Sequence, residues 1–162
     1  MIHEVTGDIL LSKADAIAHG VAPNDHFDSG LALCLRTDWP AMYKDFRHFC
    51  HTTNPEPGAL WVWAGTNGTR FINLFTQQPA PNNHGHPGRA TIENVNHCLR
   101  ELTKLVVKSE FKSLALPRLA TGVGGLPWDQ VQPLIKNHLG ALDIPVYIYT
   151  HYQKDVAAKE AA

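Results

Sequence analysis

Hydrophobic residues fall into short blocks along the chain, and the spacing within each block predicts one element. The run at residues 16–22 is small and apolar on both faces, which is typical of a central strand. Two β-rich runs, at residues 59–65 and 70–77, flank Asn67-Gly68, and this arrangement predicts a β-hairpin. In chain order, the strands predicted are residues 2–5, 16–22, 59–65, 70–77, 113–117 and 146–150.

Other blocks repeat apolar residues every three or four positions, which is the spacing of an amphipathic helix. The block from Ile92 to Val106 does so over about four turns. Ser29 is a suitable N-cap for a helix over the apolar run that follows it, and Pro40 begins another helical piece. A last helix is expected to start at residue 127 or 128 and to end at residue 138, and Pro133 inside it predicts a kink or a late start.

Strands and helices interleave along the chain, apart from the hairpin. This order predicts an α/β fold, a three-layer α/β/α sandwich with a mixed central sheet. Neither an internal repeat nor a linker interrupts it, so we expect one domain over residues 1–152. Residues 153–162 form a short polar tail that is expected to be frayed.

Composition narrows the functional class. The chain has 162 residues, of which 44% are hydrophobic, so a packed core is expected. The formal net charge of −1 gives no bulk reason to expect a nucleic-acid or membrane-surface protein. The N-terminus lacks a signal-peptide pattern and no apolar run approaches membrane-spanning length, so we expect a soluble, cytoplasmic protein, with a monomer favoured.

Cysteine and histidine spacing argues against a metal centre. Cys34, Cys50 and Cys98 lie far apart without C-x-x-C spacing, which favours buried thiols over disulfides or zinc ligands. The ten histidines include no H-E-x-x-H motif, and the pair at residues 84 and 86 sits among Asn, Pro and Gly. We therefore expect neither a metal nor another cofactor.

The stretch LPRLATGVGGLPW, residues 116–128, leaves an apolar strand and enters a helix through three glycines, Gly122, Gly124 and Gly125. Glycines let an anion approach the backbone, and a helix N-terminus attracts negative charge, so the loop is a candidate diphosphate site. Turn chemistry alone explains such a cluster equally well. The stretch has neither the lysine of a Walker A loop nor, because of Pro127, the third glycine of a dinucleotide fingerprint.

Two further stretches strengthen the anion hypothesis. FDSGLAL, residues 27–33, is a second loop-to-helix entry with small residues at its mouth, and two such entries can hold one diphosphate from both sides. Asp8 follows the first strand directly, where it can accept a hydrogen bond from a base amine. An ordinary turn or cap aspartate is the alternative for Asp8.

Taken together, VTGDIL, AIAHGVAP, DSGLAL, FINLFTQ and LPRLATGVGGLPWDQV resemble a macrodomain in their order and spacing. The resemblance covers residues 1–150. Within the superfamily the chain is most similar to the branch of the terminal ADP-ribose protein glycohydrolase and the DNA ADP-ribosyl glycohydrolase antitoxins. It implies a three-layer α/β/α fold that binds ADP-ribose in a surface cleft.

Carried over by position, the resemblance also implies individual contacts. Asp8 holds the adenine amine, with the Ile9 amide beside it. Tyr149 lies near the adenine, or is a core aromatic residue. The residues implied to line the diphosphate are Ser29, Gly30 and Leu31 on one side, and Thr121, Gly122, Val123, Gly124 and Gly125 on the other.

The chain departs from this branch where chemistry is expected. Its hydrolases place a lysine nucleophile just after the FINLFT-like strand, but this sequence has Gln77 and then Gln78. The human-type enzyme has an aspartate in the glycine loop, where this chain has Gly124. Glutamine cannot form a Schiff base, so any hydrolysis must use water.

Water needs a base or an orienting group, and the candidates are His19, His26 and Asp28, with Asp25 beside them. We favour Asp28 as the base, because it abuts the first phosphate loop, and place His26 second. The alternative is that Asp25-His26 is a solvated turn and His19 a buried histidine with its hydrogen bonds satisfied.

Three functions therefore stay open. The first is an ADP-ribosyl hydrolase that acts by a water-based mechanism on an ADP-ribosylated protein, nucleic acid or small acyl group, and this is the one we favour. The second is a phosphatase that acts on ADP-ribose 1″-phosphate, and the third is a non-catalytic ADP-ribose reader.

Overall fold

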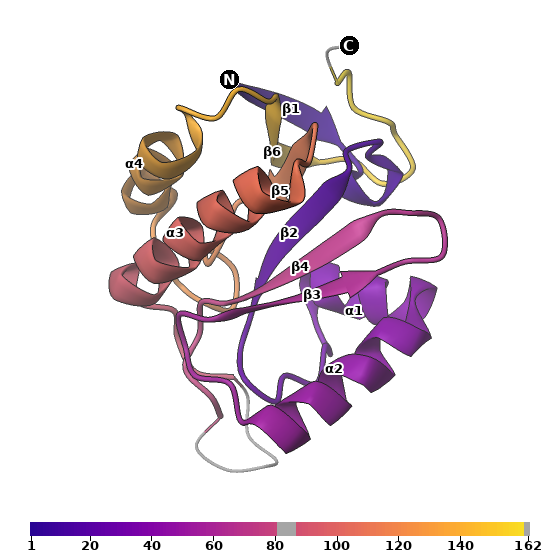
Figure 1. Cartoon of the computed structure of the whole chain (residues 1–162), viewed down its shortest axis with the longest axis vertical. Coiled ribbons are helices and arrows are strands. Elements are labelled where there is room, and N and C mark those ends of the chain that lie inside the picture. The colour runs from indigo at the N-terminus through magenta and orange to yellow at the C-terminus, as the bar shows by residue number, and fades with distance from the viewer. Residues whose placement is uncertain (81–86, 161–162) are drawn as a thin grey trace.

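The computed structural model describes residues 1–80 and 87–160, so the histidines at 84 and 86 lie outside the described residues. A six-stranded sheet runs through the molecule (Figure 1). β3 is antiparallel to β4 and every other pair is parallel, so the predicted mixed sheet is confirmed. In spatial order its strands are β1 (Ile2–Gly7), β6 (Val146–Tyr152), β5 (Leu114–Pro117), β2 (Ala16–Val21), β4 (Arg70–Phe75) and β3 (Leu60–Ala64).

Two helices cover each face of the sheet, as Figure 1 shows, so the three-layer α/β/α arrangement is also confirmed. α1 (Gly30–Asp38) and α2 (Pro40–Thr53) lie on one side. α3 (Ile92–Ser109) and α4 (Trp128–Leu139) lie on the other, and α4 runs through Pro133 without the late start. A short 3₁₀ helix, η1 (Ile9–Leu11), follows β1.

Side chains of the central strands alternate between two apolar cores. On β2, Ala16 and Ala18 join the core under α3 and α4, whereas Ile17 and Val21 join the core under α1 and α2. His19 has the same parity as Ile17 and Val21, so it faces the α1 and α2 side of the sheet. This alternation places one polar side chain, His19, between the apolar Ile17 and Val21 on that face.

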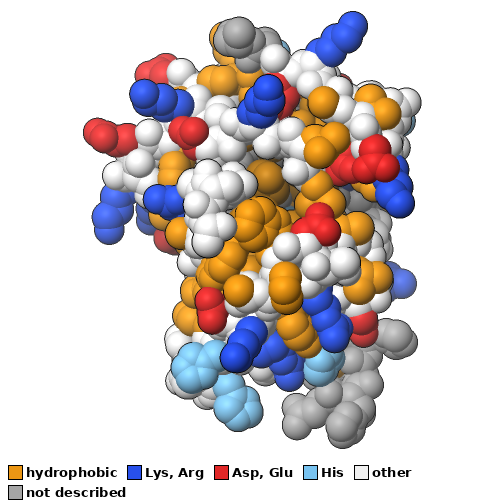
Figure 2. All heavy atoms as spheres, turned by 90° about the vertical axis from the view of Figure 1, so that its right-hand side faces the viewer, with side chains coloured by type: hydrophobic (Ala, Val, Ile, Leu, Met, Phe, Trp, Pro, Cys, Tyr) orange, Lys and Arg blue, Asp and Glu red, His pale blue; other side chains and the backbone are white. Residues whose placement is uncertain are grey.

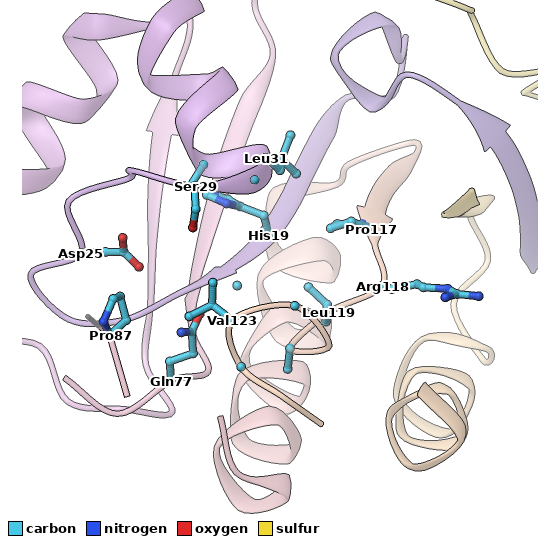
Figure 3. A pocket seen from close by; sticks show the side chains of 16 residues that line it. His19, Asp25, Ser29, Leu31, Gln77, Pro87, Pro117, Arg118, Leu119 and Val123 are labelled. Atoms are coloured by element: carbon cyan, nitrogen blue, oxygen red, sulfur yellow. The ribbon is translucent and has the colours of Figure 1, made fainter. Parts of the chain in front are cut away.

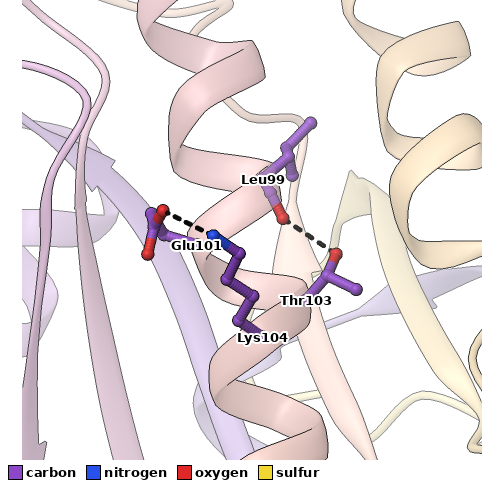
Figure 4. A network of polar contacts seen from close by, with 4 residues as sticks. All are labelled: Leu99, Glu101, Thr103 and Lys104. Atoms are coloured by element: carbon purple, nitrogen blue, oxygen red, sulfur yellow. Dashed lines mark hydrogen bonds and ion pairs between the residues drawn. The ribbon is translucent and has the colours of Figure 1, made fainter.

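α3 shows which forces hold the helical layer. Its apolar stripe is buried from Val95 onward, with Val95, Leu99, Leu102 and Val106 in the core, whereas Ile92 at its start is exposed. On its outer face Lys104 and Glu101 form a 3.5 Å ion pair, with side chains 68% and 47% exposed (Figure 4). A pair this exposed contributes about 0–1 kcal/mol, so apolar packing holds α3 in place.

The C-terminal segment differs from the frayed tail that the sequence predicts. Residues 153–160 lie along the end of β1, where the Asp8 amide donates to the Val156 carbonyl at 2.7 Å. The Gln153 amide donates to the Gly7 carbonyl at 3.1 Å. These bonds use main-chain atoms, so a polar and apparently featureless sequence gives no sign of them.

The cysteines are unpaired, as their spacing in the sequence favours. The three cysteines are free thiols, and Cys50 and Cys98 are buried. The described residues contain no group of His, Cys, Asp and Glu able to hold a metal, and none of the described helices is long and apolar enough to cross a membrane. On the face in Figure 2, charged side chains of both signs are spread around a central group of apolar ones.

Candidate functional site

A cavity of about 300 Å³ opens at the carboxyl ends of β2 and β5, where ligands of open α/β sheets bind (Figure 3). The N-terminus of α1 forms one side and the glycine loop after β5 forms the other. The lining residues are His19, Gly20, Asp25, Ser29, Gly30, Leu31, Ala32, Gln77, Pro87, Pro117, Arg118, Leu119, Ala120, Gly122, Val123 and Gly124.

The first side of the cavity is the uncapped start of α1. Ser29 occupies the N-cap position as predicted, but its side chain makes no capping hydrogen bond. The amide of Leu33 donates to the Ser29 carbonyl at 3.2 Å, whereas the amides of residues 30–32 donate to no other described residue. Unpaired amides at a helix N-terminus form an anion site.

The second side is the glycine loop, which two internal bonds fold into a tight turn. The Gly125 amide donates to the Gly122 carbonyl at 3.0 Å, and the Leu126 amide donates to the Ala120 carbonyl at 2.9 Å. The amides of residues 122–124 donate to no other described residue. Gly122, Val123 and Gly124 line the cavity as predicted, whereas Thr121 and Gly125 do not.

The glycines of this loop are required for different reasons. A Cβ on Gly124 would lie 2.6 Å from the Ala120 carbonyl oxygen, and Gly125 has a φ of +76°. Both positions therefore need glycine for the fold. A Cβ on Gly122 would meet nothing within 4 Å, and its φ lies outside the range that side chains avoid. Gly122 lines the cavity, and the fold itself does not require a glycine there.

His19 lines the cavity and is 2% exposed. Its Nε2 lies 2.6 Å from the Asn73 Oδ1, and the Asn73 Nδ2 donates to the Trp61 carbonyl at 3.4 Å. That second bond directs the Asn73 oxygen toward His19, so Nε2 carries the proton and Nδ1 has the lone pair. Burial lowers the pKa of His19 to about 4, although the Asn73 bond opposes this, so the ring is neutral at neutral pH.

Asp25 also lines the cavity, but its carboxylate holds the preceding loop together. Its Oδ2 accepts from the Ala22 amide at 3.0 Å and its Oδ1 accepts from the Phe27 amide at 2.9 Å. Burial raises the pKa of Asp25, and the two amide bonds oppose that rise. The other acidic and basic candidates, Asp28 and His26, are not among the residues that line the cavity, and Asp28 is exposed.

The residue in the position of the family lysine is buried at the cavity wall. Gln77 is 6% exposed, and its Nε2 donates to the Gly88 carbonyl at 3.1 Å. No lysine occurs among the described residues that line the cavity. The described lining of this cavity therefore holds no lysine amine.

A second cavity of about 390 Å³ continues from the first, because both share Gly30, Leu31 and Pro117. Its surface is mostly apolar, as expected for the binding of a flat ring. Ile9 and Tyr149, which the sequence analysis places near the adenine, line this cavity, and so does Leu31, which it places beside the diphosphate. The complete lining is Gly7, Ile9, Leu10, Gly30, Leu31, Cys34, Pro117, Tyr149 and Tyr152.

Asp8 does not line this cavity, although the sequence analysis places it beside the adenine. It is 3% exposed and is not among the lining residues. Sequence reasoning missed Tyr152, which lines the cavity although alternation would place it on the face opposite Tyr149. The register between β1 and β6 shifts by one residue between Tyr149 and His151, and this bulge brings Tyr152 to the same side.

Three comparisons with known proteins agree with this geometry. The family model described as Macro domain matches residues 28–135. The DNA ADP-ribosyl glycohydrolase of Thermus aquaticus is 28% identical over 92% of this chain and 41% of that protein. Homo sapiens ADP-ribose glycohydrolase OARD1 is 24% identical over 90% of this chain and 89% of that protein.

A solved structure, Thermosipho africanus DarTG in complex with ADP-ribose, aligns with a TM-score of 0.80 and 25% identity. The alignment covers 96% of this chain and 42% of that chain. The chain therefore spans about two fifths of the length of the bacterial relatives, at 41% and 42%.

Proposed function

The chain belongs to the Macro domain family, and from that premise we propose that it binds ADP-ribose in the cleft formed by the two joined cavities. The diphosphate lies between the amides of residues 30–32 and those of residues 122–124. The base lies in the apolar cavity, and the distal ribose lies toward His19 and Gln77.

The observation that carries this proposal is the pair of opposed amide rows. Both sets belong to residues that line one cavity, and Leu31, Ala32 and Gly124 are buried or half-buried, where an amide without a partner is costly. An anion that accepts from both sets relieves that cost and gains from the α1 dipole. Gly122 supports the same ligand, since nothing in the fold itself requires a glycine there.

We further propose that the chain hydrolyses an ADP-ribosyl linkage, with water as the nucleophile. Water attacks the anomeric carbon of the distal ribose, the bond to the leaving group breaks, and the water proton passes to solvent or to the departing group. A base with a pKa of about 4 is too weak to take that proton fully at neutral pH, so His19 orients the water through Nδ1. Asp28 as the base stays a prediction from the sequence, because it lies outside the cavity lining.

Relatives named DNA ADP-ribosyl glycohydrolase make ADP-ribosylated DNA the first substrate to test. Two other functions remain candidates, because Gln77 stands in the position of the nucleophilic lysine and cannot replace it. A reader binds without turnover, and a phosphatase removes the 1″-phosphate from ADP-ribose 1″-phosphate with water attacking phosphorus.

Titration calorimetry with ADP-ribose tests binding. Gly122→Glu should abolish binding because it adds bulk and negative charge at the diphosphate, whereas Gln130→Glu adds the same charge at an exposed position of α4 and should bind normally. Unchanged affinity in Gly122→Glu would place the ligand elsewhere.

A release assay on DNA-, Ser- and Glu-linked ADP-ribose, together with ADP-ribose 1″-phosphate, separates the functions. Hydrolysis predicts turnover that falls about 10²- to 10⁴-fold when the water-orienting or basic group is removed. His19→Gln and Asp28→Ala, compared in parallel, show which of the two acts. Binding without turnover on all four substrates would identify a reader.

A further inference from the structure

We propose that Glu160 is a positioning residue for the base of ADP-ribose. Its carboxylate fastens the C-terminal segment, residues 153–160, behind the apolar cavity, and the fastened segment fixes the wall on which the base packs. Glu160 itself lines neither cavity, so it acts through the groups that it holds. This inference rests on the proposed binding of ADP-ribose.

The Glu160 carboxylate accepts three hydrogen bonds from separate parts of the chain. Its Oε2 accepts from the Ser12 hydroxyl at 2.6 Å and from the Tyr149 hydroxyl at 2.7 Å. Its Oε1 accepts from the Lys13 amide at 3.0 Å. Burial and the bond to Glu160 raise the pKa of Tyr149, so its hydroxyl keeps its proton and donates. The ring that carries this hydroxyl lines the apolar cavity.

Glu160 also holds the C-terminal end of η1, the short helix that contributes Ile9 and Leu10 to the apolar cavity. Ser12 is the C-cap of η1, and its hydroxyl oxygen accepts from the Ala14 amide at 3.1 Å while it donates to Glu160. The turn that leaves η1 is therefore tied to the C-terminal segment through one hydroxyl group.

The other end of η1 is held by an earlier part of the same segment. The N-cap of η1 is Asp8, whose amide donates to the Val156 carbonyl at 2.7 Å. Its Oδ2 accepts from the Asp155 amide at 3.0 Å. Each carboxylate oxygen keeps a further lone pair, so these bonds orient Asp8 and leave it able to accept from a base. Both ends of η1 thus depend on the C-terminal segment.

Gly7 shows how closely the segment packs against the apolar cavity. Gly7 lines this cavity, and a Cβ there would lie 2.7 Å from the Ala158 amide nitrogen and 2.8 Å from the Val156 carbonyl oxygen. The close approach of the segment therefore requires a glycine. One residue contacts both the cavity and the segment, so a shift of the segment reaches the cavity wall directly.

Few apolar contacts hold the segment, so its hydrogen bonds decide whether it stays in place. Ala158 and Glu160 are half-buried, whereas the rest of residues 153–160 is exposed. Without the Glu160 carboxylate, the segment loses the three bonds at its far end. The base would then find a formed wall in only a fraction of the molecules, and the apparent affinity would fall by that fraction.

Calorimetry with ADP-ribose tests this role. Glu160→Ala should weaken binding at least about tenfold, because the wall is then formed in about a tenth of the molecules or fewer. Glu160→Gln should keep the affinity within about threefold, since its amide oxygen still accepts from the Lys13 amide and its amide nitrogen can donate to both hydroxyls. Lys159→Ala, at an exposed neighbour, should bind like the wild type.

Nuclear magnetic resonance on the same variants distinguishes positioning from a general loss of structure. In Glu160→Ala, the amides of Gly122 and Gly124 should keep their wild-type chemical shifts, whereas hydrogen exchange at the Asp155 amide should be faster. ADP-ribose should slow that exchange again, because a segment that favours the ligand is favoured by the ligand to the same degree.

The outcomes separate this inference from the proposed function. Wild-type affinity in Glu160→Ala, or an equal loss of affinity in Glu160→Gln, would overturn the inference while ADP-ribose binding stands. Changed shifts at Gly122 and Gly124 in Glu160→Ala would also overturn it, since the loss of affinity would then come from the whole cleft. Failure of the wild-type chain to bind ADP-ribose would overturn the proposed function itself.

Discussion

The His19 Nε2 lies 2.6 Å from the Oδ1 of Asn73, its register partner on the neighbouring parallel strand. Both side chains point to the α1 and α2 side of the sheet, where Phe71 and Phe75 flank Asn73 along β4. A polar pair thus interrupts an apolar face beside the cavity. The pair fixes the tautomer of His19, and burial keeps the ring neutral.

Acid should destabilise the protein through His19. Its pKa is 6.5 when unfolded and about 4 when folded, so between these values the unfolded chain binds a proton that the folded chain does not. Stability therefore falls as pH drops from about 7 to 4, by about 3 kcal/mol for this residue. Urea unfolding of wild type and His19→Gln across this range should show the difference, and parallel curves would contradict it.

Alanine should affect a different property at each of two glycines in the loop: folding stability at Gly124 and ADP-ribose binding at Gly122. Gly124→Ala forces a Cβ against the Ala120 carbonyl and should cost about 1–3 kcal/mol of folding free energy. Gly122→Ala meets open space and should change stability by less than about 0.5 kcal/mol while weakening ADP-ribose binding at least about tenfold. Thermal unfolding and calorimetry on the same samples separate the two effects. Equal loss of stability at both positions would remove the ligand-based reason for Gly122.

Borohydride should trap no adduct between the wild-type chain and an ADP-ribosylated substrate. The described lining residues include no lysine, so an imine with the opened ribose has no amine to form from. Gln77→Lys restores an amine at the cavity wall and serves as the positive control in intact-mass spectrometry. An ADP-ribose-weighted adduct on Lys13, Lys44 or any other wild-type lysine would show that the nucleophile has moved.

Removing the Glu160 carboxylate should release the C-terminal segment. Glu160→Ala leaves the Tyr149 hydroxyl and the Lys13 amide without their partner and should cost about 1–3 kcal/mol. Lys159→Ala, at an exposed neighbour, is the control. In the wild-type chain, hydrogen bonds made with the segment protect the amides of Asp8 and Asp155. Hydrogen exchange at both amides should therefore be faster in Glu160→Ala. Unchanged exchange at both amides would show that Glu160 does not hold the segment.

Periodicity predicted the parts of this fold that depend on apolar burial. The stripe of α3, the hairpin around Asn67-Gly68 and the two-faced strand β2 all follow from side-chain spacing. The glycine loop was also identified from the sequence, because three glycines between a strand and a helix do not fit an apolar pattern.

The parts that the sequence could not predict depend on backbone bonds and register. The polar segment at residues 153–160 is held by amide and carboxylate contacts that leave no hydrophobic pattern. Tyr152 reaches the apolar cavity beside Ile9 and Tyr149 through a one-residue shift in the pairing of β6 with β1. Strand alternation cannot predict such a shift. Asp8 was assigned from its place after β1, but the identity of its partners depends on a residue 147 positions later.

That separation has a consequence for synthesis. Asp8 leaves the ribosome before its partner Asp155, which follows 147 residues later in the chain. β1 also pairs only with β6 in the sheet, so the first strand waits for the last one. A nascent chain can fold its central strands earlier, but the bonds of Asp8 to Asp155 and Val156 form only after those residues are released. A chain stalled before Asp155 would leave Asp8 with the Leu10 amide but without the partner that anchors the C-terminal segment to it.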